Sequence, residues 1–235
     1  VKTRARCWSY PRAHGKLQAV QALARSCNIF FYELGTRLKF ERLVHWLQLF
    51  GMSQPLAAQL TRPDAEGKQG HLHSQAEIQI LKDRGAIAFE TVSISIGQGA
   101  LTWSPLHVAA AYATLARGGM WRSPRLIQGN SQNTSNLHLN QEGVRMALEG
   151  MRESVTKEYG TGSRLKINAK FEPTFNVEGV RIWGKTGTAE APPYRIDNVS
   201  KSIKGGRHAW FVVLASSLGK STPSVVIVVL VEHGG

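Results

Sequence analysis

Near its C-terminal end the chain reads Trp183-Gly184-Lys185-Thr186-Gly187-Thr188-Ala189-Glu190. The apolar residues Val180 and Ile182 precede this stretch and predict a β-strand. Lys185 supplies a fixed positive charge, Thr186 and Thr188 supply hydroxyls, and the glycines leave room for a ligand backbone. An extended peptide that ends in a carboxylate could add to such an edge by main-chain hydrogen bonds, with its carboxylate against the cation and the hydroxyls. Because Lys-Thr-Gly is a short match, its weight depends on the rest of the sequence.

Composition and charge bound the class of protein. With 235 residues, 42% of them hydrophobic, the chain is long enough for a sizeable core and is not expected to be disordered. The formal net charge of +13 indicates anionic surroundings, for which nucleic acid, anionic lipid and an acidic cell-wall polymer all qualify. The longest apolar run, Val225 to Val231, is too short to span a membrane. Because the first residue is Val1 rather than Met, we expect a trimmed or processed piece of a longer protein.

Signals for metals and cofactors are weak in this sequence. The two cysteines, Cys7 and Cys27, make neither a disulfide framework nor a metal quartet. His71-Leu72-His73 is interpreted as a surface loop. Gly97-Gln98-Gly99 lacks the later Gly and Lys of a phosphate-binding loop. We therefore expect no metal and no cofactor.

The hydrophobic periods divide the chain into helices followed by strands. Helical patterns run from Leu17 to an interruption at 24–28, from Ile29 to near Gly35, from Phe40 to Phe50, from Gln75 to Asp83, from Pro105 to Gly118-Gly119 and from Gln141 to Lys157. Over residues 91–96, apolar side chains alternate with hydroxyl side chains. Strands are expected over Val177–Trp183, His208–Ser216 and Ser224–Glu232, and loops over 52–75, 128–139 and 190–207. The fold class is α/β (α+β) in one domain over 1–235, with helices to about 170 and an antiparallel sheet from about 171.

Two polar triads stand far apart in this order of elements. Ser26-Cys27-Asn28 falls at the turn between the first two helices, because Ser and Asn favour turns and caps over helix interiors. Lys185-Thr186-Gly187 begins 159 positions later (185 − 26) on a strand. Together with Ser-x-x-Lys, such triads are the signature of penicillin-binding proteins and class A β-lactamases. In this respect the chain resembles the transpeptidase domain of class B penicillin-binding proteins, the group that includes penicillin-binding protein 2.

The resemblance extends over nearly the whole chain. Further similar stretches are His14-Gly15, Ser26 through Tyr32, Ser95 through Gly99, Ser104-Pro105-Leu106, Ala110 through Ala113, Gly184 through Glu190, His208 through Phe211 and Val229 through Glu232. The resemblance implies a β-lactamase/transpeptidase-like fold, with an antiparallel sheet flanked by helices and with the N-terminal part of the fold absent. It also implies acyl transfer, in which a serine attacks a peptidoglycan stem peptide and a neighbouring amine then takes the acyl group.

The resemblance further implies roles for the residues of both triads. Ser26 would relay protons toward the leaving amine, and Asn28 would hold a lysine beside the nucleophile or the substrate amide. Lys185 would set the local positive field and hydrogen-bond Ser26. The implied substrate-binding residues are Thr186, Gly187 and Thr188. The two threonine hydroxyls would bind the substrate carboxylate, and the Thr188 N–H would be an oxyanion donor.

Partners and location also follow from the resemblance. We expect peptidoglycan stem peptides as substrates, β-lactams as their mimics, and other cell-wall synthesis proteins as partners, with no role for nucleic acid. The whole protein would act on the periplasmic or extracytoplasmic face of the bacterial envelope. An upstream segment would anchor it in the inner membrane.

The family's nucleophile motif, Ser-x-x-Lys ahead of Ser-x-Asn, is missing from this sequence. The residues before Ser26 include Ser9-Tyr10-Pro11-Arg12, which has no lysine and contains a helix-breaking proline. Ser154-Val155-Thr156-Lys157 and Ser217-Leu218-Gly219-Lys220 match the spacing in the wrong order. We therefore expect the C-terminal part of a transpeptidase domain that is inactive alone. Its last strand, 224–232, would expose an edge.

Three other functions compete with this interpretation. A non-catalytic homologue that binds peptidoglycan or envelope partners is the main alternative. A β-lactamase would require the same missing motif. A nucleic-acid-binding protein is supported by the positive charge alone.

Overall fold

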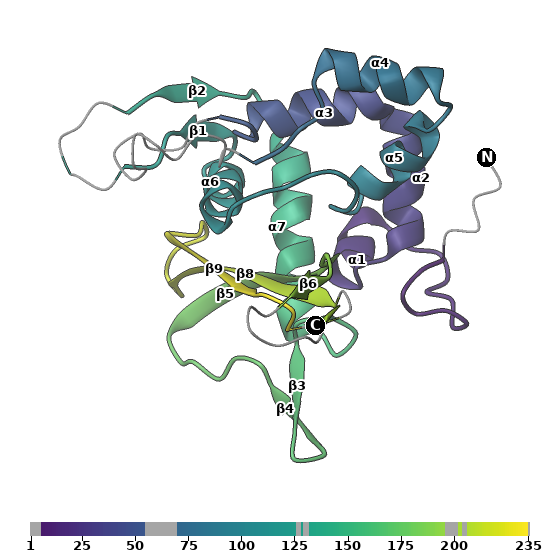
Figure 1. The fold of residues 1–235 in the computed structure, drawn as a ribbon. Helices are drawn as coiled ribbons and strands as arrows, with labels where there is room; N and C mark the ends of the chain where they lie inside the picture. The colour runs from purple at the N-terminus through teal and green to yellow at the C-terminus, as the bar shows by residue number, and fades with distance from the viewer. Residues whose placement is uncertain are drawn as a thin grey trace.

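The computed structural model describes residues 6–54, 70–125, 128, 132–195, 202–203 and 206–234. The helices are α1 (Ala19–Ala24), α2 (Asn28–Leu38), α3 (Phe40–Leu49), α4 (Gln75–Asp83), α5 (Ile87–Ile94), α6 (Pro105–Ala116) and α7 (Gln141–Thr156). The strands are β1 (Met120–Arg122), β2 (Thr134–Asn136), β3 (Arg164–Ile167), β4 (Lys170–Pro173), β5 (Val180–Glu190), β6 (Tyr194–Arg195), β7 (Ser202–Ile203), β8 (Arg207–Ser217) and β9 (Val225–Val231). Within these ranges, none of the helices is long and apolar enough to cross a membrane. Figure 1 shows α3, α4 and α5 grouped away from the sheet of β5, β8 and β9.

Strands β5, β8 and β9 form an antiparallel sheet in that order, which confirms the expected fold class. β5 continues past Trp183, where the apolar pattern ends, and the Lys-Thr-Gly stretch lies on this strand as its motif indicated, with Thr186 opposite Phe211 of β8. The small and polar residues of this stretch carry no apolar alternation, so periodicity marks only the part of the strand before the motif. Among the described strands, none pairs with the outer edge of β5 or of β9.

Helices α6 and α7 cover one face of this sheet (Figure 1). Met151 of α7 packs there against Trp183 of β5 and Leu214 of β8. On its other side α7 contacts α1, where a Cβ on Gly150 would lie only 3.0 Å from Leu23 Cβ. A glycine at this position therefore lets the two helices approach closely. Because α7 lies between α1 and β5, it brings the turn after α1 next to the middle of β5.

Residues 91–96, with their alternating side chains, do not form a strand. The stretch is helical as far as Ile94 and belongs to α5. Thr91 Oγ1 donates to the carbonyl of Ile87 at 2.6 Å, and Ser93 Oγ donates to the carbonyl of Phe89 at 3.0 Å. Hydroxyl side chains commonly bond the carbonyl one turn back in a helix, so they do not require extended backbone.

Helix boundaries that rest on capping residues are confirmed. The Ser104 side chain accepts a hydrogen bond from the His107 N–H at the start of α6, and Pro105 takes the first helical position. Helix α4 begins and ends as predicted, and Ser74 and Glu77 form a capping box at its start. The start of α6 was predictable because its capping signal is local in sequence, whereas α4 was predicted from its helical pattern without the capping box.

Short hairpins were not predicted. β1 pairs with β2, and β2 lies within the stretch 128–139 that was expected to be loop. All three β2 residues are exposed, so no burial pattern marks this strand in the sequence. β3 and β4 form a further hairpin of eight exposed strand residues, which Figure 1 shows projecting from the rest of the fold. Most of the loop predicted over 52–75 lies outside the described residues.

Candidate active site

Ser26 lies in the turn between α1 and α2 with a positive φ of 51°. The next N–H, that of Cys27, donates to the carbonyl of Ala22 at 2.9 Å and closes the turn. The indole Nε1 of Trp8 donates to the carbonyls of Arg25 and Ser26 at 3.1 and 3.0 Å. A non-glycine residue in this backbone conformation costs roughly 1–2 kcal/mol, and these bonds to the backbone of the turn offset that cost.

The side chain of Lys185 reaches this turn from β5. Its Nζ donates to Ser26 Oγ at 3.0 Å and to the carbonyl of Thr186 at 2.7 Å. Burial lowers the pKa of Lys185 from its usual 10.5 to about 8, because the charged ammonium loses hydration. An amine with this pKa can give up and regain a proton near neutral pH far more readily than an exposed lysine. The structure thus joins Ser26 and Lys185 into one hydrogen-bonded pair.

Thr186 is oriented by a residue that sequence reasoning missed. Its Oγ1 lies 2.7 Å from Thr161 Oγ1, in a hydrogen bond between the two hydroxyls. The Thr161 N–H in turn donates to the carbonyl of Ala24 at the end of α1. Thr161 lies in the loop after α7, 25 positions before Thr186, and no local motif surrounds it. Only the folded chain reveals this contact.

Thr188 lies on the outer edge of β5, beyond Thr186. The side-chain Nε2 of Gln98 donates to its carbonyl at 2.8 Å, and Gln98 Oε1 accepts from the Glu190 N–H at 3.2 Å. In an antiparallel strand the N–H and C=O of one residue point to the same side. The Thr188 N–H therefore also faces the outer edge, where an oxyanion or a peptide carbonyl could approach.

Asn28 and Gly187 stand beside this group. Burial raises the pKa of Tyr32, and a hydrogen bond with the Asn28 side chain opposes that rise. Within the described parts of the chain, no hydrogen bond joins Asn28 to Lys185. A Cβ on Gly187 would lie 3.2 Å from Trp210 Cβ, so a larger residue would press on the neighbouring strand.

The two serines that match the Ser-x-x-Lys spacing form no such pair. Ser154 is fully buried in α7, and its hydroxyl has no hydrogen-bond partner among the described residues. Lys157 is exposed at the end of the same helix. Ser217 ends β8, and its carbonyl accepts from the Lys220 N–H at 3.0 Å in the turn toward β9. Ser154 and Ser217 therefore both occupy structural positions, one buried in a helix and one in a turn between strands.

Cys7, His14 and Cys27 form a second cluster, next to Ser26 in the sequence. Their sulfur and ring-nitrogen atoms lie within 4.8 Å of one another, and Cys7 Sγ is 3.6 Å from His14 Nδ1. Burial and the positive charge of Arg25 lower the pKa of His14, which favours the neutral imidazole that binds metals. Thiolate and imidazole are ligands that Zn²⁺ prefers, so the cluster could hold this ion with one further ligand. Burial raises the pKa of Cys27, so its thiol has to give up a proton when the metal binds. The spacing of seven and thirteen residues gave no such signal.

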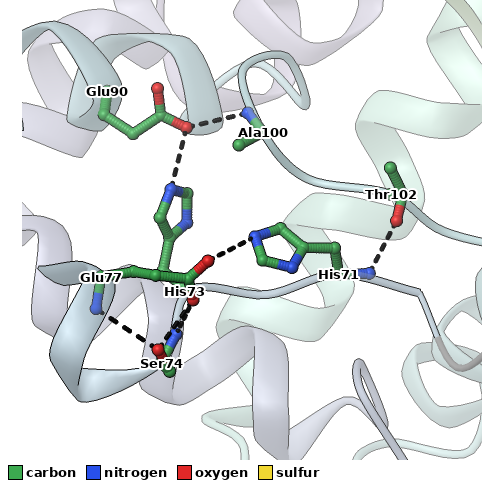
Figure 2. Close-up of polar contacts among 7 residues, drawn as sticks. All are labelled: His71, His73, Ser74, Glu77, Glu90, Ala100 and Thr102. Carbon is green, nitrogen blue, oxygen red and sulfur yellow. Dashed lines mark hydrogen bonds and ion pairs between the residues drawn. The ribbon is translucent and has the colours of Figure 1, made fainter. Parts of the chain in front are cut away.

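Figure 2 shows the polar contacts around the segment 71–77. His73 is buried, and its Nε2 lies 3.5 Å from Glu90 Oε1. The same oxygen accepts from the Ala100 N–H at 2.9 Å, while His71 Nε2 lies 3.5 Å from Glu77 Oε1. The interpretation of His71-Leu72-His73 as a surface loop is wrong for His73, because the buried Glu90 carboxylate provides its imidazole with a partner.

Comparison with known proteins places this fold and site in one family. Residues 2–235 match the family described as "Penicillin binding protein transpeptidase domain". The chain therefore belongs to the penicillin-binding protein transpeptidase family, and its mixed helix and antiparallel sheet structure is that of part of such a domain.

Several of the individual similarities are to proteins named MrdA or penicillin-binding protein 2. The chain is 25% identical over 239 residues to peptidoglycan D,D-transpeptidase MrdA of Haemophilus influenzae, covering 94% of this chain and 34% of MrdA. A structure described as "Structural coordination of polymerization and crosslinking by a peptidoglycan synthase complex" matches with a TM-score of 0.72 and 25% identity, covering 98% of this chain and 36% of that one. A complex of penicillin-binding protein 2 and MreC from Helicobacter pylori matches with a TM-score of 0.70 and 22% identity, covering 100% and 39%. The chain thus spans about a third of the length of the curated relatives.

Proposed function

We propose that this chain forms the Lys-Thr-Gly side of a serine D,D-transpeptidase site that cross-links peptidoglycan stem peptides. The observation that carries the proposal is the 3.0 Å hydrogen bond from Lys185 Nζ to Ser26 Oγ, which lies beside the outer edge of β5. It joins the two polar triads into one group, with Thr186 and Thr188 next to it along the strand. The names of two similar proteins, each called peptidoglycan D,D-transpeptidase MrdA, support the same proposal.

The contacts of each residue suit it to one step of the proposed reaction. The Ser26 hydroxyl donates a proton to the departing amine of the stem peptide and regains one from Lys185, whose pKa near 8 permits this exchange. The reverse transfer removes a proton from the incoming amine. The Thr186 and Thr188 hydroxyls bind the substrate carboxylate, and the Thr188 N–H stabilises the oxyanion. The attacking serine comes from a Ser-x-x-Lys motif upstream in the same protein.

The partners follow from the same assignment. Stem peptides are the substrates, and β-lactams react as their mimics, as the family description implies. Among structural relatives, one penicillin-binding protein 2 is seen with MreC and another chain belongs to a peptidoglycan synthase complex. Proteins of the cell-wall synthesis machinery are therefore the proposed partners. The whole protein acts outside the inner membrane, which anchors it.

Covalent labelling by a fluorescent penicillin tests this function. Intact mass and peptide mapping are read on this chain and on the same protein extended upstream in its gene. We expect no adduct on this chain and an adduct on an upstream serine of the extended protein, which Lys185→Ala abolishes and Lys157→Ala leaves unchanged. An adduct on Ser154 or Ser217 would contradict the assignment of the nucleophile. Failure of both proteins to react would favour the non-catalytic homologue that binds peptidoglycan or envelope partners.

A further inference from the structure

The side-chain amide of Gln98 occupies the outer edge of β5. Its Nε2 donates to the carbonyl of Thr188 at 2.8 Å, and its Oε1 accepts from the N–H of Glu190 at 3.2 Å. One amide that donates to residue i and accepts from residue i+2 reproduces the bonds of a neighbouring parallel strand. Gln98 thus covers part of an edge that no described strand covers.

The loop that carries Gln98 is fixed on both sides. The Gln98 N–H donates to the carbonyl of Ser93 at 3.0 Å, which ties the loop to the end of α5. Two residues later the Ala100 N–H donates to the buried carboxylate of Glu90, and Figure 2 shows this contact beside that with His73. Fixed backbone on both sides of Gln98 means that its contact with β5 is part of the fold.

The position of this amide limits what can bind along β5. A peptide whose carboxylate contacts Thr186 and Thr188 would continue along the strand toward Glu190. Residues 186–190 span about 13 Å at roughly 3.3 Å per residue, so such a peptide would meet Gln98 within its first residues. The carbonyl of Thr188 and the N–H of Glu190 are the groups that the peptide backbone needs there. A ligand that ends at Thr188 needs neither.

We propose that Gln98 gates the outer edge of β5: its amide has to leave Thr188 and Glu190 before a peptide acyl donor can pair with the strand. This inference rests on the function proposed above and names a residue that determines specificity within it. The gate distinguishes ligands by how far along β5 they extend. Ligands whose side-chain amide needs the Thr188 carbonyl compete with Gln98, whereas ligands without such an amide do not.

Hydrogen exchange on this chain tests whether the gate is closed. In Gln98→Ala the Glu190 N–H loses its acceptor, so its exchange should accelerate about three- to tenfold, the effect of one net hydrogen bond. Gln79→Ala is the matched control, because Gln79 bonds Asp83 on the exposed side of α4 and does not touch β5. Equal exchange of Glu190 in Gln98→Ala and in the wild type would overturn the proposal.

Reaction with two probes tests whether the gate matters to ligands. The protein extended upstream is treated with a penicillin that carries an acylamino side chain and with a carbapenem that lacks this amide. We expect the acylation rate constant of the penicillin, divided by that of the carbapenem, to rise about three- to tenfold in Gln98→Ala. The same rise is expected in Gln98→Asn, whose side chain is too short to reach both Thr188 and Glu190. The Gln79→Ala control should leave the ratio as in the wild type.

The two proposals fail in different ways. An unchanged or lower ratio in a protein that reacts with both probes would overturn the gate and leave the transpeptidase function standing. A wild-type protein that reacts with neither probe would refute the function, and the gate on an acyl donor would fall with it.

Discussion

Lys185 Nζ lies 3.0 Å from Ser26 Oγ, although 159 positions separate the two residues in the chain. Helix α7 makes this contact possible, because it packs against α1 on one side and against β5 on the other. The amine that reaches Ser26 is thereby removed from water, and its pKa falls to about 8. This burial has a consequence for stability as well as for proton transfer.

The stability of the chain should rise with pH between about 8 and 10.5 through Lys185. In this range the unfolded lysine still binds its proton while the folded one has lost it, so unfolding takes up a proton and becomes less favourable as pH rises. Over the full range the free energy of unfolding should increase by about 3 kcal/mol. Urea unfolding from pH 7 to 10 should show most of this gain in the wild type relative to Lys185→Met. Lys157→Met, at an exposed site, should follow the wild type, and parallel curves for wild type and Lys185→Met would contradict the burial of the amine.

Gly99 and Gly97 should respond differently to alanine. Both have positive φ, 83° and 75°, so alanine at either position is strained by roughly 1 kcal/mol. A Cβ on Gly99 would also lie 2.5 Å from Glu90 Oε1, whereas a Cβ on Gly97 would meet nothing within 4 Å. We expect Gly99→Ala to lower the free energy of unfolding by about 1–3 kcal/mol more than Gly97→Ala. Equal losses in urea unfolding would mean that Glu90 moves aside.

Thr161→Val should weaken the reaction of the extended protein without unfolding it. Valine keeps the shape of threonine but removes the hydroxyl that lies 2.7 Å from Thr186 Oγ1. The second-order rate of acylation by a fluorescent penicillin should fall about three- to tenfold, as expected for one hydrogen bond. Thr156→Val is the control, because that hydroxyl bonds only the Arg152 carbonyl on the exposed side of α7. The assignment of Thr161 as a positioning residue fails if both variants react like the wild type.

Sequence reasoning predicted the parts of the fold whose signal is local. Ser104 and Pro105 marked the start of α6, and the apolar run in β9 marked a strand. The local signal of residues 91–96 was ambiguous, because the hydroxyls of Thr91 and Ser93 suit a helix as well as an alternating pattern. Exposed strands such as β2 bury no side chain, so no periodicity marked them.

The residues of the candidate site were likewise predictable only where their signal in the sequence is local. Ser26 and Lys185 were found because each lies in a short motif whose order and residue types are characteristic. Thr161 and Gln98 were not assigned roles, because their partners on β5 lie 25 and 90 positions away and neither contact leaves a pattern nearby. Gly97-Gln98-Gly99 was noticed for its glycines, but the sequence could not show that the amide between them reaches the strand.

The cluster of Cys7, His14 and Cys27 should bind Zn²⁺. The expected stoichiometry is about one ion per chain, measured by native mass spectrometry and by competition with a chromogenic chelator. Cys27→Ser should lower the affinity by at least roughly tenfold, because a thiolate ligand is lost. His45→Ala, at an exposed histidine of α3, should bind like the wild type. Unchanged affinity in Cys27→Ser would place any bound zinc elsewhere.

The exposed face of β9 should make this chain self-associate. Val225, Ile227, Val229 and Val231 share that face and are 51, 49, 48 and 51% exposed, and the adjoining strand edge is unpaired among the described strands. A strand with a free edge and an apolar face favours edge-to-edge pairing. Ile227→Lys places a charge on this face, and sedimentation should show less association without loss of stability.

Val226→Lys is the contrasting variant, because Val226 points to the opposite face of β9 and packs on the core with Trp183 and Leu214. We expect Val226→Lys to lower the free energy of unfolding by about 1–3 kcal/mol. Equal association of wild type and Ile227→Lys over the same concentrations would show that β9 is not the surface responsible.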